Sequence, residues 1–298
     1  MPFSRTGILL AAGLALVAGP ALARCEDFVA QEKPQNTFAQ NIGRSFETIE
    51  EEGWIEFALY EDFAPWSSLV AGEPQGIDVD IARLIAAELG VEPRFRLVAA
   101  SETLDADLRN YIWKGAIVDG HVSDVMLHVP YDSAFTCRVE QAVFTGQYGA
   151  EALAIGYDRA TYPDKGPVPA YFRFDPVGVE NDSLSDFYLS SIGNGTMAAG
   201  IHRYRDTAAA MAALAAGEVG AVMAPLAQIE AALTPEMAVH QPPLVGLARG
   251  QWTVGVAVSQ QHRDLGYAVD YAIETALADG RIAAIFAAAG VSHLTPER

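Results

Sequence analysis

The sequence predicts an α/β protein of two lobes, each with a parallel sheet covered by helices. Strand and helix patterns alternate along residues 54–129, beginning with the strand "WIEFALY". The alternation restarts at residue 177, after a Pro- and Gly-rich stretch over residues 162–176. Hydrophobic residues make up 51% of the 298-residue chain and charged residues 19%, which suffices for two folded domains with buried cores.

The first unit reads strand, helix, strand, helix, strand, an order that predicts a parallel sheet. In the helix over residues 78–90, apolar residues recur at helical spacing on one face, Asp78 is expected to cap the start, and Gly90 the end. The other elements of this unit are strands at residues 54–60, 91–100 and 123–129 and a helix at residues 103–115.

The second unit has a similar size and its own helix signals. The helix over residues 207–217 is expected to be capped by Asp206 or Thr207 and to end at Gly217. The remaining elements from here to the C-terminus are strands at residues 149–158, 177–181, 219–224 and 252–259 and helices at residues 183–193, 226–233, 264–280 and 281–290.

The N-terminus carries the three parts of a secretory signal peptide. Arg5 is followed by an apolar run over residues 7–17 and by small residues at 21–23. The run is shorter than the roughly 20 residues of a membrane span, and Arg24 argues against lipid attachment at Cys25. We therefore expect a signal peptide at 1–23 cleaved after Ala23, an N-terminal extension at 24–50, and a soluble periplasmic product with no membrane insertion.

The chain has two cysteines, Cys25 and Cys137. In an oxidising compartment they are expected to form one disulfide; the alternative is two unrelated thiols, one flexible and one buried. The formal net charge of -19 argues against nucleic acid and anionic membranes as partners.

Four segments, in this order and spacing, resemble the type 2 periplasmic solute-binding proteins of the kind that bind amino acids. They are "YEDFAPWS", "GEPQGIDVDIARLIAAELG", "ALAAGEVGAVMA" and the closing pair "WTVGVAVS" and "ALADGRIAAIFAAAGV". The resemblance covers about residues 52–295. It implies two α/β lobes with a hinge of two crossovers, the first lobe at 50–152 plus 251–298 and the second at 153–250.

The resemblance also implies a function. Such proteins bind a small ligand between the lobes and close on it by hinge bending. We expect a monomeric binding protein, not an enzyme, that takes a carboxylate-bearing solute for an ABC-type transporter and needs no cofactor. The stretch "SDVMLHVP" with "FTGQY" is similar to a narrower branch, with the pattern "D-V-V-x-G-V-P", whose members accompany periplasmic quinoprotein (PQQ) alcohol dehydrogenases. That similarity implies a dehydrogenase partner instead of a permease.

Three aromatic residues follow the first strand, at a position that lines the cleft in this fold. Tyr60, Phe63 and Trp66 are candidates to stack on a ligand or hold a cation. The alternative is that Phe63 and Trp66 only pack the lobe.

By resemblance, Arg138 aligns with the arginine that grips a ligand carboxylate, and Ser133 lies five residues earlier. The alternative is a surface arginine paired with Glu140. In the second lobe, Asp182 and Ser183 stand at the helix start whose amides bind the carboxylate in the family, but Asp182 would repel an anion.

Family members that bind amino acids also tend to carry an aspartate where this chain has Ala224 and Pro225. This departure puts ordinary α-amino-acid binding in doubt. Asp78 completes the candidate ligand-binding set.

His128 is expected at the cleft end of its strand, as a polar residue lining the site. It belongs to a sequence cluster of possible metal ligands with Asp119, His121, Asp124 and Asp132, but no spacing matches a metal motif, so no metal site is predicted. A dehydratase-like enzyme on the same fold is the remaining alternative, since a cleft carboxylate or histidine can serve as general base. Glu61, Glu180 and His128 are available for that role.

Overall fold

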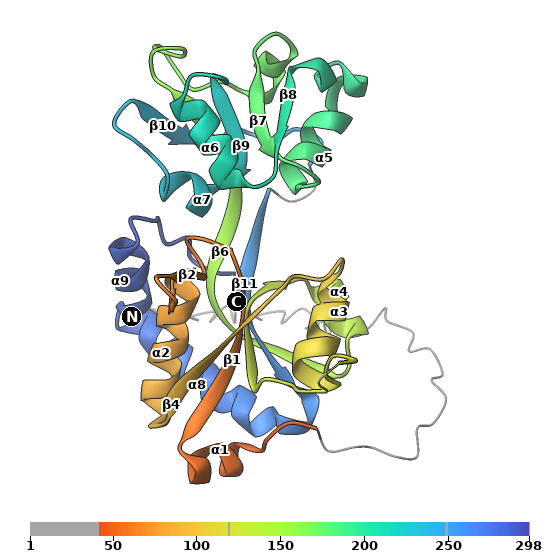
Figure 1. Cartoon of the computed structure of the whole chain (residues 1–298), viewed down its shortest axis with the longest axis vertical. Coiled ribbons are helices and arrows are strands. Elements are labelled where there is room, and N and C mark those ends of the chain that lie inside the picture. Colours follow the sequence, from red (N-terminus) through yellow and green to blue (C-terminus); the bar gives the residue numbers. More distant parts are fainter. Residues whose placement is uncertain (1–41, 119, 248–249, 298) are drawn as a thin grey trace, which may run out of the picture.

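A computed structural model describes residues 42–118, 120–247 and 250–297. The predicted signal peptide, Cys25 and most of the predicted extension lie outside the described residues. Two α/β lobes share one sheet of nine described strands in the order β4-β1-β5-β11-β6-β9-β7-β8, with β10 paired to β6 (Figure 1). The predicted α/β fold class with two lobes is confirmed.

In the first lobe, at the bottom of Figure 1, β1 (Trp54–Tyr60) lies between two parallel neighbours. It pairs in parallel with β4 (Glu92–Val98) and β5 (Val125–Tyr131), as the alternating pattern predicted. Helices α2 (Ile77–Leu89), α8 (Arg263–Ala278) and α9 (Arg281–Ala288) bury their apolar residues on one face of the sheet. The helix α3 (Leu104–Leu108) and the π-helix η1 (Arg109–Trp113) cover the other face.

The second lobe repeats this layering on a smaller sheet. β7 (Val177–Glu180) pairs in parallel with β8 (Ile201–Tyr204) and β9 (Ala221–Pro225). Helices α6 (Thr207–Ala215) and α7 (Leu226–Glu230) pack on one face, and α5 (Leu184–Ser191) packs on the other. The further described elements are α1 (Phe46–Glu52), β2 (Ser68–Val70), β3 (Glu73–Gln75), α4 (Ser133–Arg138), β10 (Met237–His240), and the 3-10 helices η2 (Pro169–Arg173), η3 (Ile192–Gly195), η4 (Ala198–Gly200) and η5 (Gln260–His262).

Two long strands carry the chain between the lobes (Figure 1). β6 (Ala142–Asp158) pairs with β11 (Gln251–Ser259) as far as Ala152, and then with β9 from Leu153 onward. These are the two crossovers of the predicted fold class. Each crossover consists of one extended strand. A change of backbone angles at a few residues of β6 and β11 is therefore enough to change the relative orientation of the lobes.

The C-terminal tail adds a non-covalent connection across the same region. The amide of Ala150 donates to the carbonyl of Leu294 at 3.0 Å. Ser292 donates twice, through its amide and its hydroxyl, to the carboxylate of Glu230 on α7, at 2.7 Å each. Since Val291 packs into the first-lobe core and Leu294 against the α6–α7 core, the tail contacts both lobes at the hinge.

The start of α2 differs from the sequence prediction. Its N-cap is Gly76, and no side chain caps it, so the expected capping role of Asp78 is wrong. The amide of Ile77 instead donates to the carbonyl of Pro65 at 3.0 Å, and that of Asp78 to Trp66 at 2.9 Å. The backbone of the preceding loop thus takes the place of a capping side chain.

The predicted extension at 24–50 also contains the start of a helix. Ser45 caps α1 by accepting a hydrogen bond from the amide of Thr48 at 3.2 Å, and Ile49 is fully buried. A serine before a short amphipathic run is a helix-start signal that the polar composition of this stretch obscured.

We predict that Gly76→Ala destabilises the protein far more than Gly90→Ala at the other end of α2. Both residues have positive φ, 132° and 72°, but a Cβ at Gly76 would lie 2.2 Å from the Trp66 carbonyl oxygen, whereas nothing lies within 4 Å at Gly90. Denaturant unfolding should show a loss of about 1–2 kcal/mol for Gly90→Ala and about 3 kcal/mol or more for Gly76→Ala. Equal losses would contradict this account of the α2 start.

Candidate functional site

The loop after β1 is held in a fixed conformation on α2. Phe63 and Ser67 exchange backbone hydrogen bonds at 2.8 and 2.9 Å, and the hydroxyl of Ser67 donates to the carbonyl of Tyr60 at 2.6 Å. Together with the two bonds to the first amides of α2, these contacts fix the loop at the carboxyl end of a parallel strand. That end is where α/β sheets bind ligands.

An aromatic cluster lies beneath this loop and contains four of the predicted site residues. The ring of His128 on β5 lies between Phe63 and Trp66, with centroid distances of 4.9 and 4.4 Å. Trp66 is fully buried and also contacts Phe286, so it packs the lobe. Phe63 keeps partial exposure and contacts Tyr60 edge-on at 6.1 Å.

His128 and Asp78 form a buried polar pair. Asp78 is 1% exposed, and its Oδ2 lies 3.2 Å from the Nδ1 of His128. Its Oδ1 accepts a hydrogen bond from the phenol of Tyr148 at 2.6 Å, and that phenol accepts one from the His128 amide at 3.0 Å. Burial, and then the charge of Asp78, raise the pKa of the Tyr148 phenol well above its ordinary value.

The backbone of His128 has φ 56°, a left-handed conformation that favours glycine. The related pattern "D-V-V-x-G-V-P" has glycine at this place. A histidine kept in a strained backbone conformation beside a buried carboxylate is typical of a functional position.

The polar end of Tyr60 is already bonded within the first lobe. Its phenol donates to Asp107 at 2.8 Å, and the other oxygen of Asp107 accepts from the Ser101 amide at 2.8 Å. Burial and then the charge of Asp107 raise the pKa of this phenol. Tyr60 therefore offers a ring edge, rather than a free hydroxyl, to a ligand.

The second lobe presents the turn between β8 and α6. Asp206 caps α6 by accepting from the Ala209 amide at 2.7 Å, as predicted. Beside it, the side chain of Arg205 is 86% exposed and lies 2.9 Å from Asp206 through its Nε. The carboxylate of Glu180 accepts from the amide and hydroxyl of Thr207, which fixes the end of β7 to the start of α6.

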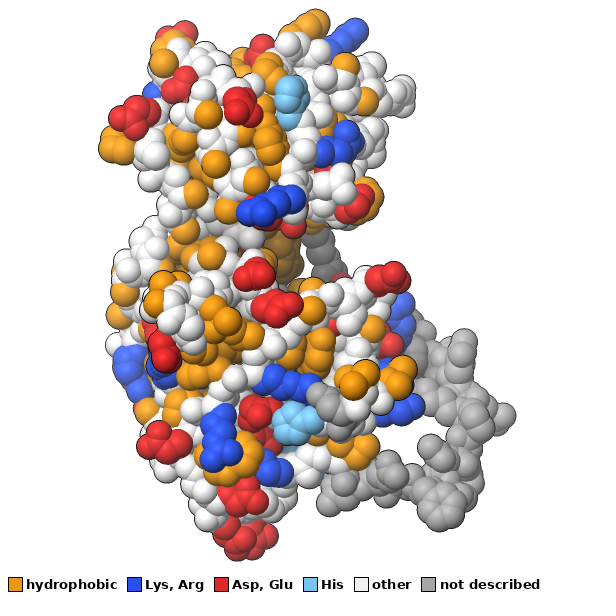
Figure 2. All heavy atoms as spheres, in the orientation of Figure 1, with side chains coloured by type: hydrophobic (Ala, Val, Ile, Leu, Met, Phe, Trp, Pro, Cys, Tyr) orange, Lys and Arg blue, Asp and Glu red, His pale blue; other side chains and the backbone are white. Residues whose placement is uncertain are grey.

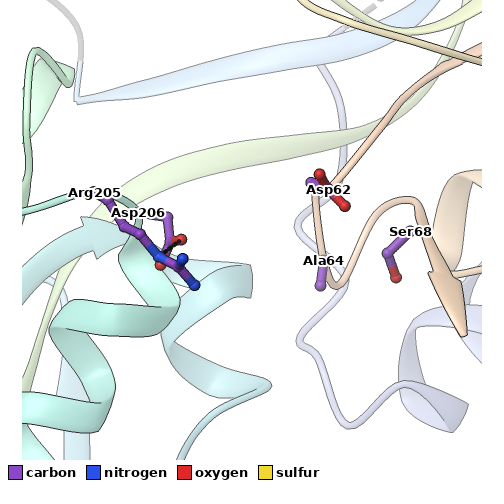
Figure 3. Close-up of a pocket in the computed structure, with 5 residues that line it drawn as sticks. All are labelled: Asp62, Ala64, Ser68, Arg205 and Asp206. Atoms are coloured by element: carbon purple, nitrogen blue, oxygen red, sulfur yellow. Dashed lines mark ion pairs between the residues drawn. The ribbon is translucent and has the colours of Figure 1, made fainter.

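A cavity of about 460 Å³ separates the two turns (Figure 3). Its first-lobe wall is the loop after β1 and its second-lobe wall is the β8–α6 turn. The lining residues are Asp62, Ala64, Ser68, Arg205 and Asp206. Figure 2 shows Asp and Glu side chains on the first-lobe edge of this gap, and basic and acidic side chains next to each other on the second-lobe edge. Arg205 and Asp62 were not among the predicted site residues.

Asp182 and Ser183 lie at the start of α5 and form hydrogen bonds there. The Ser183 hydroxyl accepts from the Asp186 amide at 3.2 Å, and the Asp182 amide donates to the Asp186 carboxylate at 3.2 Å. The Ser183 amide donates to the carbonyl of Glu180 at 3.3 Å. These three amides are therefore already bonded and are not offered to a ligand carboxylate. Binding at this helix start remains a prediction.

Ser133 and Arg138 lie on α4, and neither is among the residues that line the cavity. Ser133 accepts from the Thr136 hydroxyl at 3.0 Å, and the exposed Arg138 guanidinium lies 5.8 Å from the Phe135 ring. Their roles stay predictions. Cys137, also on α4, is disulfide-bonded, and its predicted partner Cys25 lies outside the described residues.

The sequence cluster of possible metal ligands is divided among separate contacts. His121 bonds Glu56 at 2.7 Å, Asp124 bonds Arg44, and Asp132 caps α4, while Asp119 lies outside the described residues. Among the described residues, no three or more His, Cys, Asp or Glu are grouped so as to hold a metal ion. In the same part of the chain, no helix is both long and apolar enough to cross a membrane.

Glu151 is a buried carboxyl that the sequence reasoning missed. It lies on β6 at the crossover, is 3% exposed, and interacts with Asp78 and Glu230. Burial, and then the charges of these two carboxylates, raise its pKa from 4.5 to about 8. The sequence does contain a signal for this buried carboxyl, because Glu151 is the one charged residue in the apolar run "GAEALAIGY".

We predict that Glu151 makes the protein less stable as pH rises from about 5 to 8. Below pH 4.5 the carboxyl is protonated in both states; above it, the unfolded chain loses a proton that the folded chain keeps until about pH 8. The free energy of unfolding should fall by up to about 1.4 kcal/mol per pH unit from this group. Denaturant unfolding of Glu151→Gln should lack this slope, and the exposed Glu50→Gln should keep it. A slope unchanged in Glu151→Gln would disprove the effect.

Comparison with known proteins places the fold. Residues 55–112 match the family model described as bacterial extracellular solute-binding proteins, family 3. No curated protein sequence matches the chain. Three similar solved structures are two of AncCDT-1 and one from Streptococcus pneumoniae. The first is described as an ancestral cationic amino acid solute-binding protein, with TM-score 0.67, 16% identity, and coverage of 82% of this chain and 98% of that one.

The second AncCDT-1 structure is described as a precursor of cyclohexadienyl dehydratase, with TM-score 0.58, 16% identity, and coverage of 82% and 97%. The Streptococcus pneumoniae structure is an amino acid ABC transporter substrate-binding protein bound to L-arginine, with TM-score 0.59, 18% identity, and coverage of 85% and 100%. At these identities the likeness shows the fold, and the predicted type 2 periplasmic binding-protein fold is confirmed.

Proposed function

We propose that this chain is a periplasmic solute-binding protein that closes on a small carboxylate-bearing solute and delivers it to an ABC-type transporter. The observation that carries the proposal is the cavity whose two walls come from different lobes, joined by the single strands β6 and β11. A volume of about 460 Å³ suits a small molecule. The solute-binding proteins among the structural neighbours support the same function.

The side chain of Arg205 supports the proposal that the ligand carries a carboxylate. A guanidinium has five N–H donors, and a single contact with Asp206 leaves most of them for a ligand. Two parallel N–H bonds from one arginine match the two oxygens of a carboxylate. Closure of the lobes would remove water from Arg205 and strengthen that contact. Arg138 is the second candidate, by resemblance.

Two measurements test the proposed binding of a solute and the closure of the lobes on it. The protein would be titrated calorimetrically with carboxylic acids, amino acids, polyamines and sugars, with the methyl ester or amide of each binding acid as its control. We expect a carboxylate to bind, its neutral derivative not to, and the radius of gyration in X-ray scattering to fall on binding. At 100 times its Kd, a ligand should stabilise the protein by about 2.7 kcal/mol. A folded protein that binds no member of the panel would overturn the proposal.

A dehydratase-like enzyme is the second candidate, and the buried Asp78–His128 pair favours it. A carboxylate 3.2 Å from a histidine ring prepares that histidine for proton transfer. In a dehydration, a proton given by His128 to the leaving hydroxyl would accompany C–O cleavage. The electron pair of an adjacent C–H bond would form the new double bond, and the proton of that C–H bond would pass to solvent, so that the net loss is one water. Loss of water from a bound hydroxy acid, seen by mass spectrometry in the wild type and absent in His128→Asn, would establish this activity.

A partnership with a quinoprotein alcohol dehydrogenase stays a prediction from the narrower resemblance. Co-purification of a quinoprotein dehydrogenase with the periplasmic protein would establish it.

A further inference from the structure

We propose that the hinge carries a proton-operated switch, in which the carboxyl of Glu151 on β6 sets the relative orientation of the two lobes. Glu151 interacts electrostatically with one carboxylate of each lobe, Asp78 on α2 of the first and Glu230 on α7 of the second. We call these three residues the carboxyl triad. The switch belongs to the hinge, so it works without a solute in the cavity.

Glu151 lies where β6 passes from one lobe to the other (Figure 1). It is paired with Trp252 of β11, and two residues later, at Leu153, β6 begins to pair with β9 of the second lobe. Glu151 is 3% exposed. A change of lobe orientation alters the backbone at this point, and with it the access of water to the carboxyl and its distance from the other members of the triad.

The C-terminal tail ties the second lobe to the first at the same place. Ser292 donates through its amide and its hydroxyl to the carboxylate of Glu230, at 2.7 Å each. Glu230 is therefore both the acceptor that connects α7 to the tail and a charged neighbour of Glu151. A negative charge on Glu151 repels this acceptor, and so favours an arrangement in which α7 lies farther from the crossover.

The charges that act on Glu151 within the described part of the chain are both acidic, namely Asp78 and Glu230. Each of them disfavours the ionised form of Glu151. The other charged or titratable groups of the elements packed here are His128 and Tyr148, which contact Asp78, His293, whose ring contacts the Tyr148 carbonyl, Glu297 of the tail, and Arg281 of α9, which is paired with Glu88 and Asp279.

The direction of the switch follows from proton binding. In the arrangement of the structure, burial and then the charges of the other two carboxylates raise the pKa of Glu151 to about 8. An arrangement that admits water or moves Glu230 away returns this pKa toward 4.5. Protonation therefore favours the arrangement of the structure. Between about pH 5 and 8, each rise of one pH unit weakens it by up to about tenfold relative to the other arrangement.

The experiment is X-ray scattering of the ligand-free protein at fixed ionic strength over a pH series that extends below and above this range. We expect one radius of gyration at low pH, a change as the pH rises toward about 8, and a constant value above it, where Glu151 is ionised in both arrangements. Circular dichroism at each pH would establish that the protein stays folded. The net charge of -19 acts on the wild type and on every variant in nearly the same way.

Two variants and a control identify the group responsible. Glu151→Gln keeps the size of the side chain and cannot ionise, so it should hold the low-pH radius at every pH. The control Glu50→Gln removes an exposed carboxyl on α1 and should keep the wild-type profile. Ser292→Ala removes a donor to Glu230 without changing a charge. It weakens the arrangement of the structure and should move the midpoint of the change to lower pH, by about one unit.

A radius of gyration that is independent of pH in the wild type would overturn the inference. So would a change that persists in Glu151→Gln, since it would belong to another group, such as His128 or His293. If Glu151→Gln does not fold, Ser292→Ala decides: a midpoint at lower pH supports the switch, and an unchanged midpoint overturns it.

A consequence for solute binding rests on the proposed function. A solute that selects one arrangement of the lobes binds more weakly as the other becomes favoured. Its Kd should therefore change between about pH 5 and 8 in the wild type and stay constant in Glu151→Gln, after correction for titration of the solute itself. A pH-dependent radius in a protein that binds no solute would refute the proposed function and support the switch. Solute binding with a pH-independent radius would do the reverse.

Discussion

The carboxylate of Asp78 is the contact on which the first-lobe wall of the cleft depends. Its two oxygens meet the Tyr148 phenol from β6 and the His128 ring from β5, and its own amide bonds the Trp66 carbonyl of the loop. One buried residue thus joins a helix, two strands and the loop that lines the cavity. A buried carboxylate is tolerable only with such partners, so loss of any one of them would disturb all of these elements.

The second-lobe wall is positioned by different bonds, and only the hinge relates the two. Glu180 fixes the β8–α6 turn to the end of β7, and Arg203 fixes β8 to α5 through Asp186. Each wall is therefore held by hydrogen bonds within its own lobe. If the lobes close as we propose, the contacts that change are those of β6, β11 and the C-terminal tail, where Ser292 donates to Glu230. Glu151 is buried in the same region and interacts with Asp78 and Glu230, so its protonation bears on the hinge and on the anchor of the first-lobe wall.

The sequence predicted what depends on local patterns and failed where a tertiary contact decides. β1 spans residues 54–60 as predicted, Gly90 ends α2, and Asp206 caps α6, because periodicity and caps are written in neighbouring residues. The α2 start was placed wrongly because carbonyls from the loop replace the cap, and only a glycine at position 76 permits their approach. The predicted aromatic residues and His128 lie together, although His128 is in the middle of β5 rather than at the strand end expected from the sequence.

The charged residues that line the cavity could not be predicted from the sequence. A charged side chain can bind a ligand only if no other group of the protein already engages it, and the residue type does not show this. Asp182, Asp186 and Arg203 look as suitable as Asp62 and Arg205, yet the first three are engaged with one another or with the start of α5. Some charged side chains cap a helix or form an ion pair in the folded protein, and the sequence alone does not show which ones do so. Once those are set aside, the charged residues that line the cavity are Asp62 on the first lobe and the Arg205–Asp206 pair on the second.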